Sequence, residues 1–223
     1  MPEERMREII SFVAAGLKDF SISRRREKLA WGVPVPGDSE QVMYVWFDAL
    51  VNYVSAIGWP LDMERFTKWW PVTQIAGKDN LRQQAAMWQA MLLSAGIPLS
   101  RSIFIHGFIT SGGQKMSKSL GNVINPLELV QTYGVDAVRY VLLRHVSHVE
   151  DSDLTLSAIH EHYTAHLTNG LGNLVARVMT LAESHLPHPV ALEDADEKLD
   201  GSFLSSIEAF HFNEAMDVVF AKV

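Results

Sequence analysis

Val72-Thr73-Gln74-Ile75-Ala76 is rich in β-branched residues and predicts a short strand, and Gly77-Lys78-Asp79-Asn80 directly after it predicts a turn. Apolar residues at helical spacing then run from about Leu81 to Ala95, and Ile103-Phe104-Ile105 predicts another strand. Strands that alternate with helices form the repeating unit of a largely parallel sheet. This stretch therefore predicts an α/β fold.

Before this unit the sequence predicts one further helix and one further strand. Apolar residues at helical spacing place a helix from Glu3 to Lys18. Prolines and glycines then fix an extended, turning path over residues 31–38. The β-branched and aromatic run Val42–Phe47 predicts a buried strand, with a helix that begins near Asp48.

Beyond Pro126 the pattern changes, and strands give way to helices. Helical spacing predicts helices over residues 126–133, 135–144, 156–184 and 199–221. A stretch of prolines and acidic residues, 187–200, separates the last two. The second half of the chain is therefore expected to be mainly helical.

Composition narrows the class of protein. The net charge of −7 does not indicate nucleic-acid binding by the whole surface, so any RNA contact must come from local basic groups. The chain has no Cys, which excludes disulfides and thiolate metal sites and fits a reducing compartment. No apolar run reaches the roughly 18 residues that a membrane span needs. We therefore expect a cytoplasmic protein with no membrane partner.

The sharpest chemical signal is the segment 112–122, Gly-Gly-Gln-Lys-Met-Ser-Lys-Ser-Leu-Gly-Asn. Two ammonium groups stand three residues apart beside two hydroxyls, with glycines on both sides. Such a loop can close on a triphosphate and neutralise charge as pyrophosphate departs. It is not a Walker P-loop, because Gly-x4-Gly-Lys-Ser is absent. A solvated basic surface loop is the alternative interpretation.

Lys115 to Ser119 match letter for letter the second signature of class I aminoacyl-tRNA synthetases. Other stretches resemble the methionyl-tRNA synthetases in particular, and the resemblance runs from about residue 1 to at least Arg177. These stretches are Asp19–Arg24 with Trp31–Pro36, Tyr44–Leu50 with Tyr53, and Ala76–Arg82 with Trp88. They disfavour the other class I synthetases.

The resemblance implies a fold and an activity. Residues 1–110 would be the C-terminal half of a Rossmann-like nucleotide-binding domain, 111–155 the lysine loop with a linking segment, and 156–223 a truncated all-α anticodon-binding bundle. The implied enzyme is a methionine–tRNA ligase of protein biosynthesis. It would activate methionine to methionyl-adenylate with ATP and Mg²⁺ and then transfer it to its cognate tRNA.

The resemblance also implies site residues. Lys115 and Lys118 would be catalytic, and ATP would bind Lys115, Met116, Ser117, Lys118 and Ser119. Methionine would contact Trp46, Asp48, Ala49, Tyr53, Asp79, Gln84 and Trp88, of which the two carboxylates would hold its ammonium group or the shape of the pocket. Aromatic rings suit a polarisable thioether. Gln83 stands where the family usually has an aromatic residue, which leaves the methionine affinity open.

The first signature of class I synthetases, His-x-Gly-His, is missing from the sequence, and Ile105-His106-Gly107-Phe108 is only a superficial echo of it. We therefore expect the N-terminal half of the same enzyme to lie before Met1. We also expect the isolated chain to be inactive. A non-catalytic tRNA-binding or interaction fragment is the alternative.

In the predicted helix 156–184, apolar residues form one stripe at helical spacing: Leu167, Leu171, Leu174, Val178 and Leu181. Asn173 and Arg177 project away from that stripe, and by resemblance they would contact the tRNA anticodon. His160, His162 and His166 lie nearby, but His-Glu-x-x-His fails because Thr164 replaces its second His. We expect a titrating surface there and no metal site in this chain.

Overall fold

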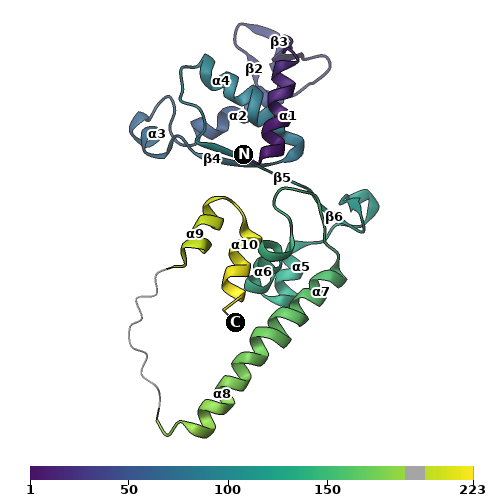
Figure 1. The fold of residues 1–223 in the computed structure, drawn as a ribbon. Coiled ribbons are helices and arrows are strands. Elements are labelled where there is room, and N and C mark those ends of the chain that lie inside the picture. The colour runs from purple at the N-terminus through teal and green to yellow at the C-terminus, as the bar shows by residue number, and fades with distance from the viewer. Residues whose placement is uncertain (189–198, 223) are drawn as a thin grey trace. The chain divides into compact units, whose positions relative to one another are not determined.

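A computed structural model describes residues 1–188 and 199–222. The chain divides into two compact units, Met1–Ile105 and His106–Val223, which we call the N-terminal and C-terminal units (Figure 1). Each has a hydrophobic core of its own. Among the described residues, none of the helices combines the length and the apolar character that a membrane crossing requires.

The N-terminal unit is α/β. Its helices are α1 (Glu3–Ala14), α2 (Val45–Ser55), α3 (Met63–Trp69), the 3-10 turn η1 (Lys78–Asn80), the π-helix η2 (Gln83–Met87) and α4 (Trp88–Ser94). Its strands are β1 (Ser23–Arg25), β2 (Pro34–Val35), β3 (Asp38–Met43), β4 (Thr73–Gly77) and β5 (Ser102–His106). The main core consists of Leu50, Val54, Phe66, Trp70, Trp88, Leu92 and Ile97.

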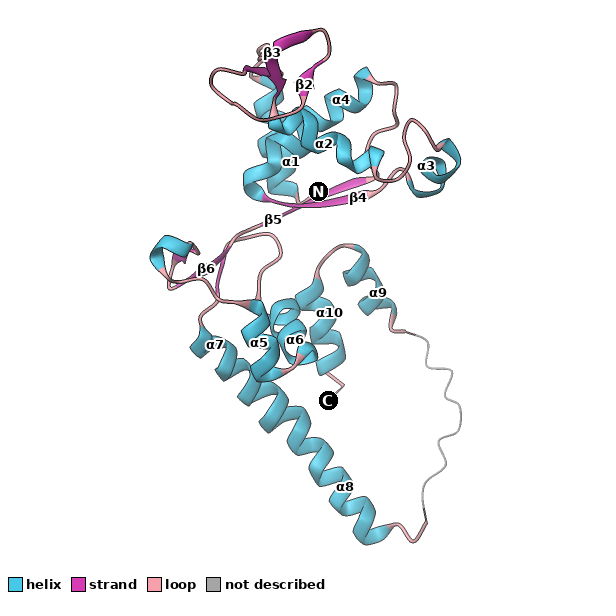
Figure 2. Cartoon of the chain, turned by 180° about the vertical axis from the view of Figure 1, so that it is seen from behind, coloured by secondary structure: helices cyan, strands magenta, loops and turns pink. Residues whose placement is uncertain are grey.

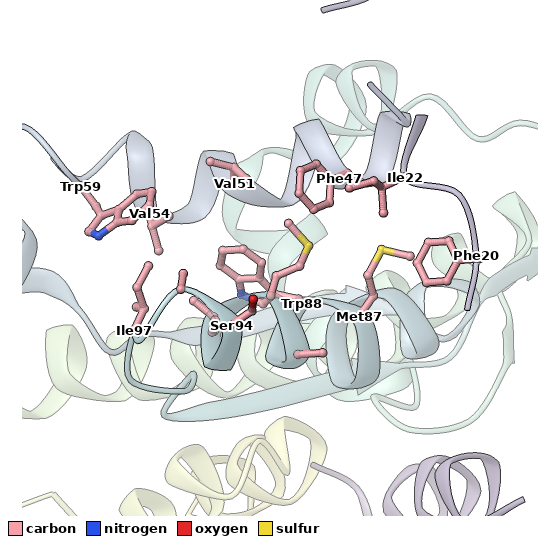
Figure 3. A pocket seen from close by; sticks show the side chains of 14 residues that line it. Phe20, Ile22, Phe47, Val51, Val54, Trp59, Met87, Trp88, Ser94 and Ile97 are labelled. Atoms are coloured by element: carbon pink, nitrogen blue, oxygen red, sulfur yellow. The ribbon is translucent and has the colours of Figure 1, made fainter. Parts of the chain in front are cut away.

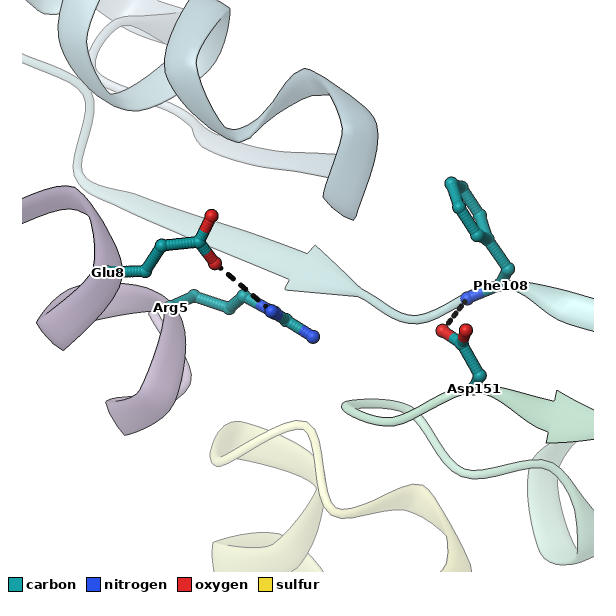
Figure 4. Close-up of polar contacts among 4 residues, drawn as sticks. All are labelled: Arg5, Glu8, Phe108 and Asp151. Carbon is teal, nitrogen blue, oxygen red and sulfur yellow. Dashed lines mark hydrogen bonds and ion pairs between the residues drawn. The ribbon is translucent and has the colours of Figure 1, made fainter. Parts of the chain in front are cut away.

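The predicted strand, turn, helix and strand between residues 72 and 105 are confirmed. Strand β4 leads into η1, η2 and α4, and β5 pairs with β4. The helix predicted from Glu3 is also confirmed, although it ends at Ala14 rather than Lys18. Within it, Arg5 Nη1 donates to Glu8 Oε2 at 3.1 Å (Figure 4).

The prediction of a strand over Val42–Phe47 is wrong in its second half. Strand β3 ends at Met43, Tyr44 is extended, and α2 begins at Val45. The N–H groups of Phe47 and Asp48 both donate to the carbonyl of Tyr44, at 2.9 and 3.1 Å. Because helical spacing buries Leu50 and Val54, tertiary packing overrides the strand propensity of the aromatic run.

The prediction of a largely parallel sheet is also wrong for the sheet around β3. Strands β1 and β2 both pair antiparallel with β3, in the order β1-β3-β2. Ser23 lies opposite Met43, and Pro34 lies opposite Val42. A short antiparallel sheet of this kind needs no crossover helix, which explains why the alternation of strands and helices did not reveal it.

The C-terminal unit begins with strands and continues with helices. The early elements are β6 (Ile109–Ser111), β7 (Gln114–Lys115), the 3-10 turn η3 (Lys118–Leu120), α5 (Pro126–Tyr133), α6 (Val135–His145) and β8 (Ser152–Asp153). The later ones are α7 (Leu156–His162), the π-helix η4 (Tyr163–Gly172), α8 (Asn173–His185), α9 (Gly201–Glu208) and α10 (Phe212–Phe220). The core consists of Leu129, Val138, Tyr140, Val141, Val146, Leu154 and Ile159.

Two expectations for this unit need correction. Strands do not stop at Pro126, because β8 pairs parallel with β6. The helix predicted over residues 199–221 is two helices, since Phe210 takes a positive φ of 63° between α9 and α10. The long predicted helix is confirmed as the continuous path α7–η4–α8 (Figure 2). The separating stretch 187–200 lies mostly outside the described residues.

Candidate functional site

The lysine loop is built on a tight β-hairpin. Strands β6 and β7 pair antiparallel, with Thr110 opposite Lys115 and Ser111 opposite Gln114. The two connecting residues, Gly112 and Gly113, have φ values of 64° and 70°. A two-residue hairpin with positive φ at both positions favours glycine, which explains the Gly-Gly pair.

After β7 the loop is held by its own side chains. The Oγ of Ser117 accepts from the N–H of Leu120 at 3.2 Å and caps η3. Asn122 Oδ1 accepts from the N–H of Ser117 at 2.9 Å, and Asn122 Nδ2 donates to the Lys115 carbonyl at 3.4 Å. Asn122 therefore ties the two ends of the loop together, a role that sequence analysis did not assign to it.

Both lysines of the loop are exposed. The Nζ of Lys115 lies 4.4 Å from the centroid of the Phe108 ring, close enough for a cation–π contact. Lys118 opens the 3-10 turn η3. Two exposed ammonium groups on a short ordered loop can receive a polyanion without first breaking a buried ion pair.

Two carboxylates from β8 and the residue before it anchor the hairpin. Asp151 Oδ1 accepts from the N–H of Phe108 at 2.9 Å (Figure 4). Asp153 Oδ1 accepts from Thr110 Oγ1 at 2.9 Å and from the N–H of Gly113 at 2.8 Å. Neither residue was predicted from the sequence, since each lies about 40 positions along the chain from its partner.

Gly107 lets the same two segments approach each other. A Cβ at this position would overlap the carbonyl of Glu150, so only glycine fits without moving the backbone. The Ile105-His106-Gly107-Phe108 echo therefore has a structural reason at Gly107. His106 Nδ1 lies 2.7 Å from the Gly107 carbonyl oxygen, a local hydrogen bond.

Part of the predicted methionine site converges in the N-terminal unit. Tyr53 on α2 accepts a hydrogen bond through its hydroxyl from Gln84 Nε2 on η2, at 3.0 Å. The rings of Tyr53 and Trp88 lie 6.0 Å apart between centroids. Gln84 and Trp88 are buried, and the structure gives Gln84 Oε1 and Trp88 Nε1 no hydrogen-bond partner. We call Tyr53, Gln84 and Trp88 the aromatic–amide cluster.

The remaining predicted methionine residues are less tightly joined to this cluster. Trp46 is partly buried against the same core, and it lies on the same face of α2 as Tyr53. Asp48, Ala49 and Asp79 are exposed, and Asp79 Oδ1 accepts from Asn80 Nδ2 at 3.2 Å. Within the described part of the chain, no hydrogen bond or ion pair joins either carboxylate to Tyr53 or Gln84.

An apolar cavity of about 460 Å³ lies beside the cluster, between α2 and the helical segment η2–α4 (Figure 3). Among the predicted methionine residues, its lining includes Trp88 alone. From α2 the cavity receives Phe47, Val51 and Val54, which lie on a face roughly 120° from that of Trp46 and Tyr53 at about 100° per residue. This cavity therefore lies on a different face of α2 from the predicted methionine contacts Trp46 and Tyr53.

Gln83 faces another region. It lines a second cavity of about 640 Å³ together with Phe12, Lys18 and Arg82. The guanidinium of Arg82 lies over the Phe12 ring, 4.5 Å from the ring centroid. The Oε1 of Gln83 is buried without a hydrogen-bond partner in the structure. The amide that departs from the family pattern thus lies on the side of α1, away from the Tyr53–Gln84 hydrogen bond.

Asn173 and Arg177 are both exposed on α8. Arg177 lines a surface depression with Ala176, Thr180 and Leu181. The apolar stripe of this helix is exposed as well: Leu174, Val178 and Leu181 are 40%, 53% and 59% exposed. Exposure alone therefore does not separate the predicted anticodon residues from the stripe.

The histidines are arranged differently from the prediction. His145, which sequence analysis did not single out, stacks on His162 with centroids 3.8 Å apart and lies 5.0 Å from His166. Burial, with the charges of His162, His166 and Arg144, lowers the pKa of His145 to about 4. Burial also lowers the pKa of His166, so this residue is not a freely titrating surface group. His160 lies outside the group and contacts Tyr133.

Comparisons with known proteins agree on one family. A family model described as tRNA synthetases class I (M) matches residues 1–179. The methionine–tRNA ligase of Brucella suis is 47% identical over 204 residues, which cover 89% of this chain and 39% of that protein. The enzyme of Thermotoga maritima is 42% identical over 221 residues, covering 97% of this chain and 34% of the relative.

Solved structures give the same result. The Mycobacterium tuberculosis methionyl-tRNA synthetase in complex with methionyl-adenylate matches with a TM-score of 0.81 and 41% identity, over 99% of this chain and 46% of that one. The apo form of the same enzyme matches with a TM-score of 0.74 over 98% of this chain. The chain spans about two fifths of the length of the Brucella relative.

Proposed function

Because the chain belongs to the methionine family of class I tRNA synthetases, we propose that it supplies the ATP loop, methionine contacts and an anticodon surface of a methionine–tRNA ligase. The observation that carries the proposal is the ordered hairpin that presents Lys115 and Lys118 to solvent. In this proposal residues 1–110 are the second half of the nucleotide-binding domain, 111–155 the loop and linker, and 156–223 part of the helical anticodon domain. The reaction belongs to protein biosynthesis in the cytoplasm.

The lysine loop would act on ATP, which enters with Mg²⁺. Residues Lys115–Ser119 would contact the phosphates, and the two ammonium groups would neutralise the charge that develops as pyrophosphate leaves. Stabilisation of this kind acts on the transition state more than on bound substrate, so its loss lowers the rate constant. The hairpin, the Ser117 cap and the Asn122 bridge support this role, since they order the loop before substrate arrives.

Methionine would bind beside the aromatic–amide cluster. The rings of Tyr53 and Trp88, with Trp46 on the same face of α2, suit a thioether. Gln84 Oε1 is a buried acceptor without a partner, and the ammonium group of the substrate can supply the missing donor. Asp48, Ala49 and Asp79 would border the site, where the exposed carboxylates add negative charge for the same ammonium group.

The tRNA would meet α8. Asn173 and Arg177 stand one turn apart and are exposed. An amide can hydrogen-bond to the edge of an unstacked base, and a guanidinium can stack on its face. These two residues are therefore our proposed anticodon contacts.

The alternative is a tRNA-binding or interaction fragment without catalysis. The observation in its favour is the absence of His-x-Gly-His from the 223 residues. Under either proposal the isolated chain shows no methionine-dependent ATP–pyrophosphate exchange.

A chimera separates the two proposals. The part of this chain that aligns with the Brucella suis enzyme, at 47% identity over 204 residues, would replace the matching stretch of that enzyme. If the chain supplies a working loop and methionine site, a folded chimera exchanges pyrophosphate into ATP in a methionine-dependent manner. Exchange at background level in a chimera with normal circular dichroism and tRNA binding would favour the non-catalytic fragment.

A further inference from the structure

Three histidines of the C-terminal unit come together from two separate helical segments. His145 ends α6, His162 ends α7, and His166 lies in η4. All three are partly buried, and one potential ligand atom from each lies within 4.8 Å of the others. We propose that His145, His162 and His166 form a binding site for one divalent transition-metal ion of the zinc type. This site is separate from the ATP, methionine and tRNA contacts proposed above.

The spacing suits one small ion. A tetrahedral Zn²⁺ holds its nitrogen ligands at about 2.0–2.1 Å, which places two such nitrogens about 3.3 Å apart. The rings of His145 and His162 are now nearly parallel, at 3° and 3.8 Å between centroids. Parallel stacked rings do not aim their lone pairs at one point, so binding requires the rings to rotate out of the stack. A separation of at most 4.8 Å between ligand atoms keeps that adjustment small.

The helix geometry supplies two of the ligands together. His162 and His166 are four residues apart, the spacing at which two helical histidines share one face and chelate a metal. They also span the junction between α7 and the π-helix η4. His145 then approaches this pair from α6.

The electronic state of the imidazoles is also suitable. A metal binds neutral imidazole, and the pKa values of His145 and His166 are both lowered by burial and by neighbouring charges. His145 Nε2 is buried and has no hydrogen-bond partner in the structure. A neutral ring nitrogen of this kind offers an unused lone pair. Imidazole ligands favour Zn²⁺, Cu²⁺, Ni²⁺ and Fe²⁺ over Mg²⁺ or Ca²⁺.

The charges around the three histidines limit their affinity for a metal ion. Arg144 is adjacent to them, and its positive charge repels a metal cation. Its guanidinium is partly neutralised, because Nε donates to Asp217 Oδ1 at 3.0 Å and Nη1 donates to the Tyr140 hydroxyl at 2.7 Å. It also lies 4.5 Å from the centroid of the Phe220 ring. Three neutral protein ligands leave a fourth position for water, as in open zinc sites, and the bound ion would tie α6 to the α7–η4 helix.

The test uses the 223-residue chain, freed of metal with a chelator and titrated with Zn²⁺ or Co²⁺ alone. We expect one equivalent to bind by calorimetry. We also expect Co²⁺ to give the visible absorption of a low-symmetry nitrogen site. Each of His145→Gln, His162→Gln and His166→Gln should weaken binding by more than about 10-fold, since even outer-shell changes reach that scale.

His160→Gln is the matched control, because His160 lies on α7 but outside the cluster. It should bind as the unchanged chain does. The ion should also raise the melting temperature of the unchanged chain and of His160→Gln but not of the cluster variants. His166→Gln is compared by circular dichroism to exclude misfolding.

Several outcomes would overturn the site. They are no saturable binding, unchanged affinity in the cluster variants, or an equal loss in His160→Gln, which would indicate adventitious chelation by surface histidines.

Discussion

The lysine loop and the aromatic–amide cluster are held in place by different forces. The loop is exposed, and its conformation depends on a glycine turn, a serine cap, an asparagine bridge and the two anchoring aspartates. The cluster is mostly buried, and its side chains come from α2, η2 and α4, which the core packs together. A substitution in the loop can therefore alter the reaction without altering the fold, whereas a substitution in the aromatic–amide cluster affects both the reaction and the fold.

Trp88→Ala should give the largest effect on stability. Trp88 is 2% exposed and contacts both Tyr53 and Trp70 through its ring. Removing a buried aromatic side chain typically costs about 3–5 kcal/mol in free energy of unfolding. Urea denaturation of the 223-residue chain measures this loss. Trp31→Ala is the control, because Trp31 is 82% exposed and should change stability by less than about 0.5 kcal/mol. Equal losses in the two variants would remove the distinction between the regions.

Asp153→Ala should release the hairpin while leaving the core intact. The substitution removes the acceptor for both Thr110 Oγ1 and the Gly113 N–H, and each hydrogen bond to a charged group contributes about 1.5–3 kcal/mol before solvent screening. We expect faster hydrogen exchange at the Gly113 amide and slower adenylate formation in the chimera. Asp153→Asn keeps an acceptor oxygen. It should therefore restore part of the protection of the Gly113 amide from exchange and part of the rate of adenylate formation. Unchanged exchange in Asp153→Ala would show that the hairpin does not need this anchor.

Tyr53→Phe should give the smallest effect. It removes the hydroxyl that accepts from Gln84 Nε2, and a hydrogen bond of this kind contributes about 0.5–1.5 kcal/mol. Methionine affinity of the chimera should fall roughly 2- to 12-fold by equilibrium titration, with little change in the rate constant of adenylate formation. Tyr44→Phe is the control, since Tyr44 contacts Phe20 and Arg24 through its ring. A loss in rate rather than in affinity would place Tyr53 in the chemical step.

Local patterns predicted the loop and most helices, since the information lies within a few residues. The Gly-Gly pair, the lysines and the boundaries of α5 follow from neighbouring residues, and all are found in the structure. The end of β3 was misplaced because Leu50 and Val54, several residues further on, decide where α2 begins. Propensity at Val45–Phe47 alone could not show this.

Contacts over long separations were missed for a related reason. Asp151 and Asp153 reach the hairpin across about 40 residues, and His145 meets His162 only because α6 packs on the α7–η4 path. The acidic run 150–153 was the only local signal for the anchors. For His145, the sequence pattern offered none beyond its residue type.

If the exposed loop acts in the chemical step, Lys118→Ala should slow that step. The measurement is the single-turnover rate constant of adenylate formation in the chimera, with saturating ATP and methionine. Loss of one preorganised electrostatic contact typically costs about 2.7–4 kcal/mol, or on the order of 10²–10³ in rate. We predict a fall of that size in Lys118→Ala, a comparable one in Lys115→Ala, unchanged methionine affinity, unchanged stability, and no effect of the exposed control Lys68→Ala. A fall of less than about threefold in Lys118→Ala, with ATP binding intact, would contradict the account and make the loop an ordinary basic surface turn.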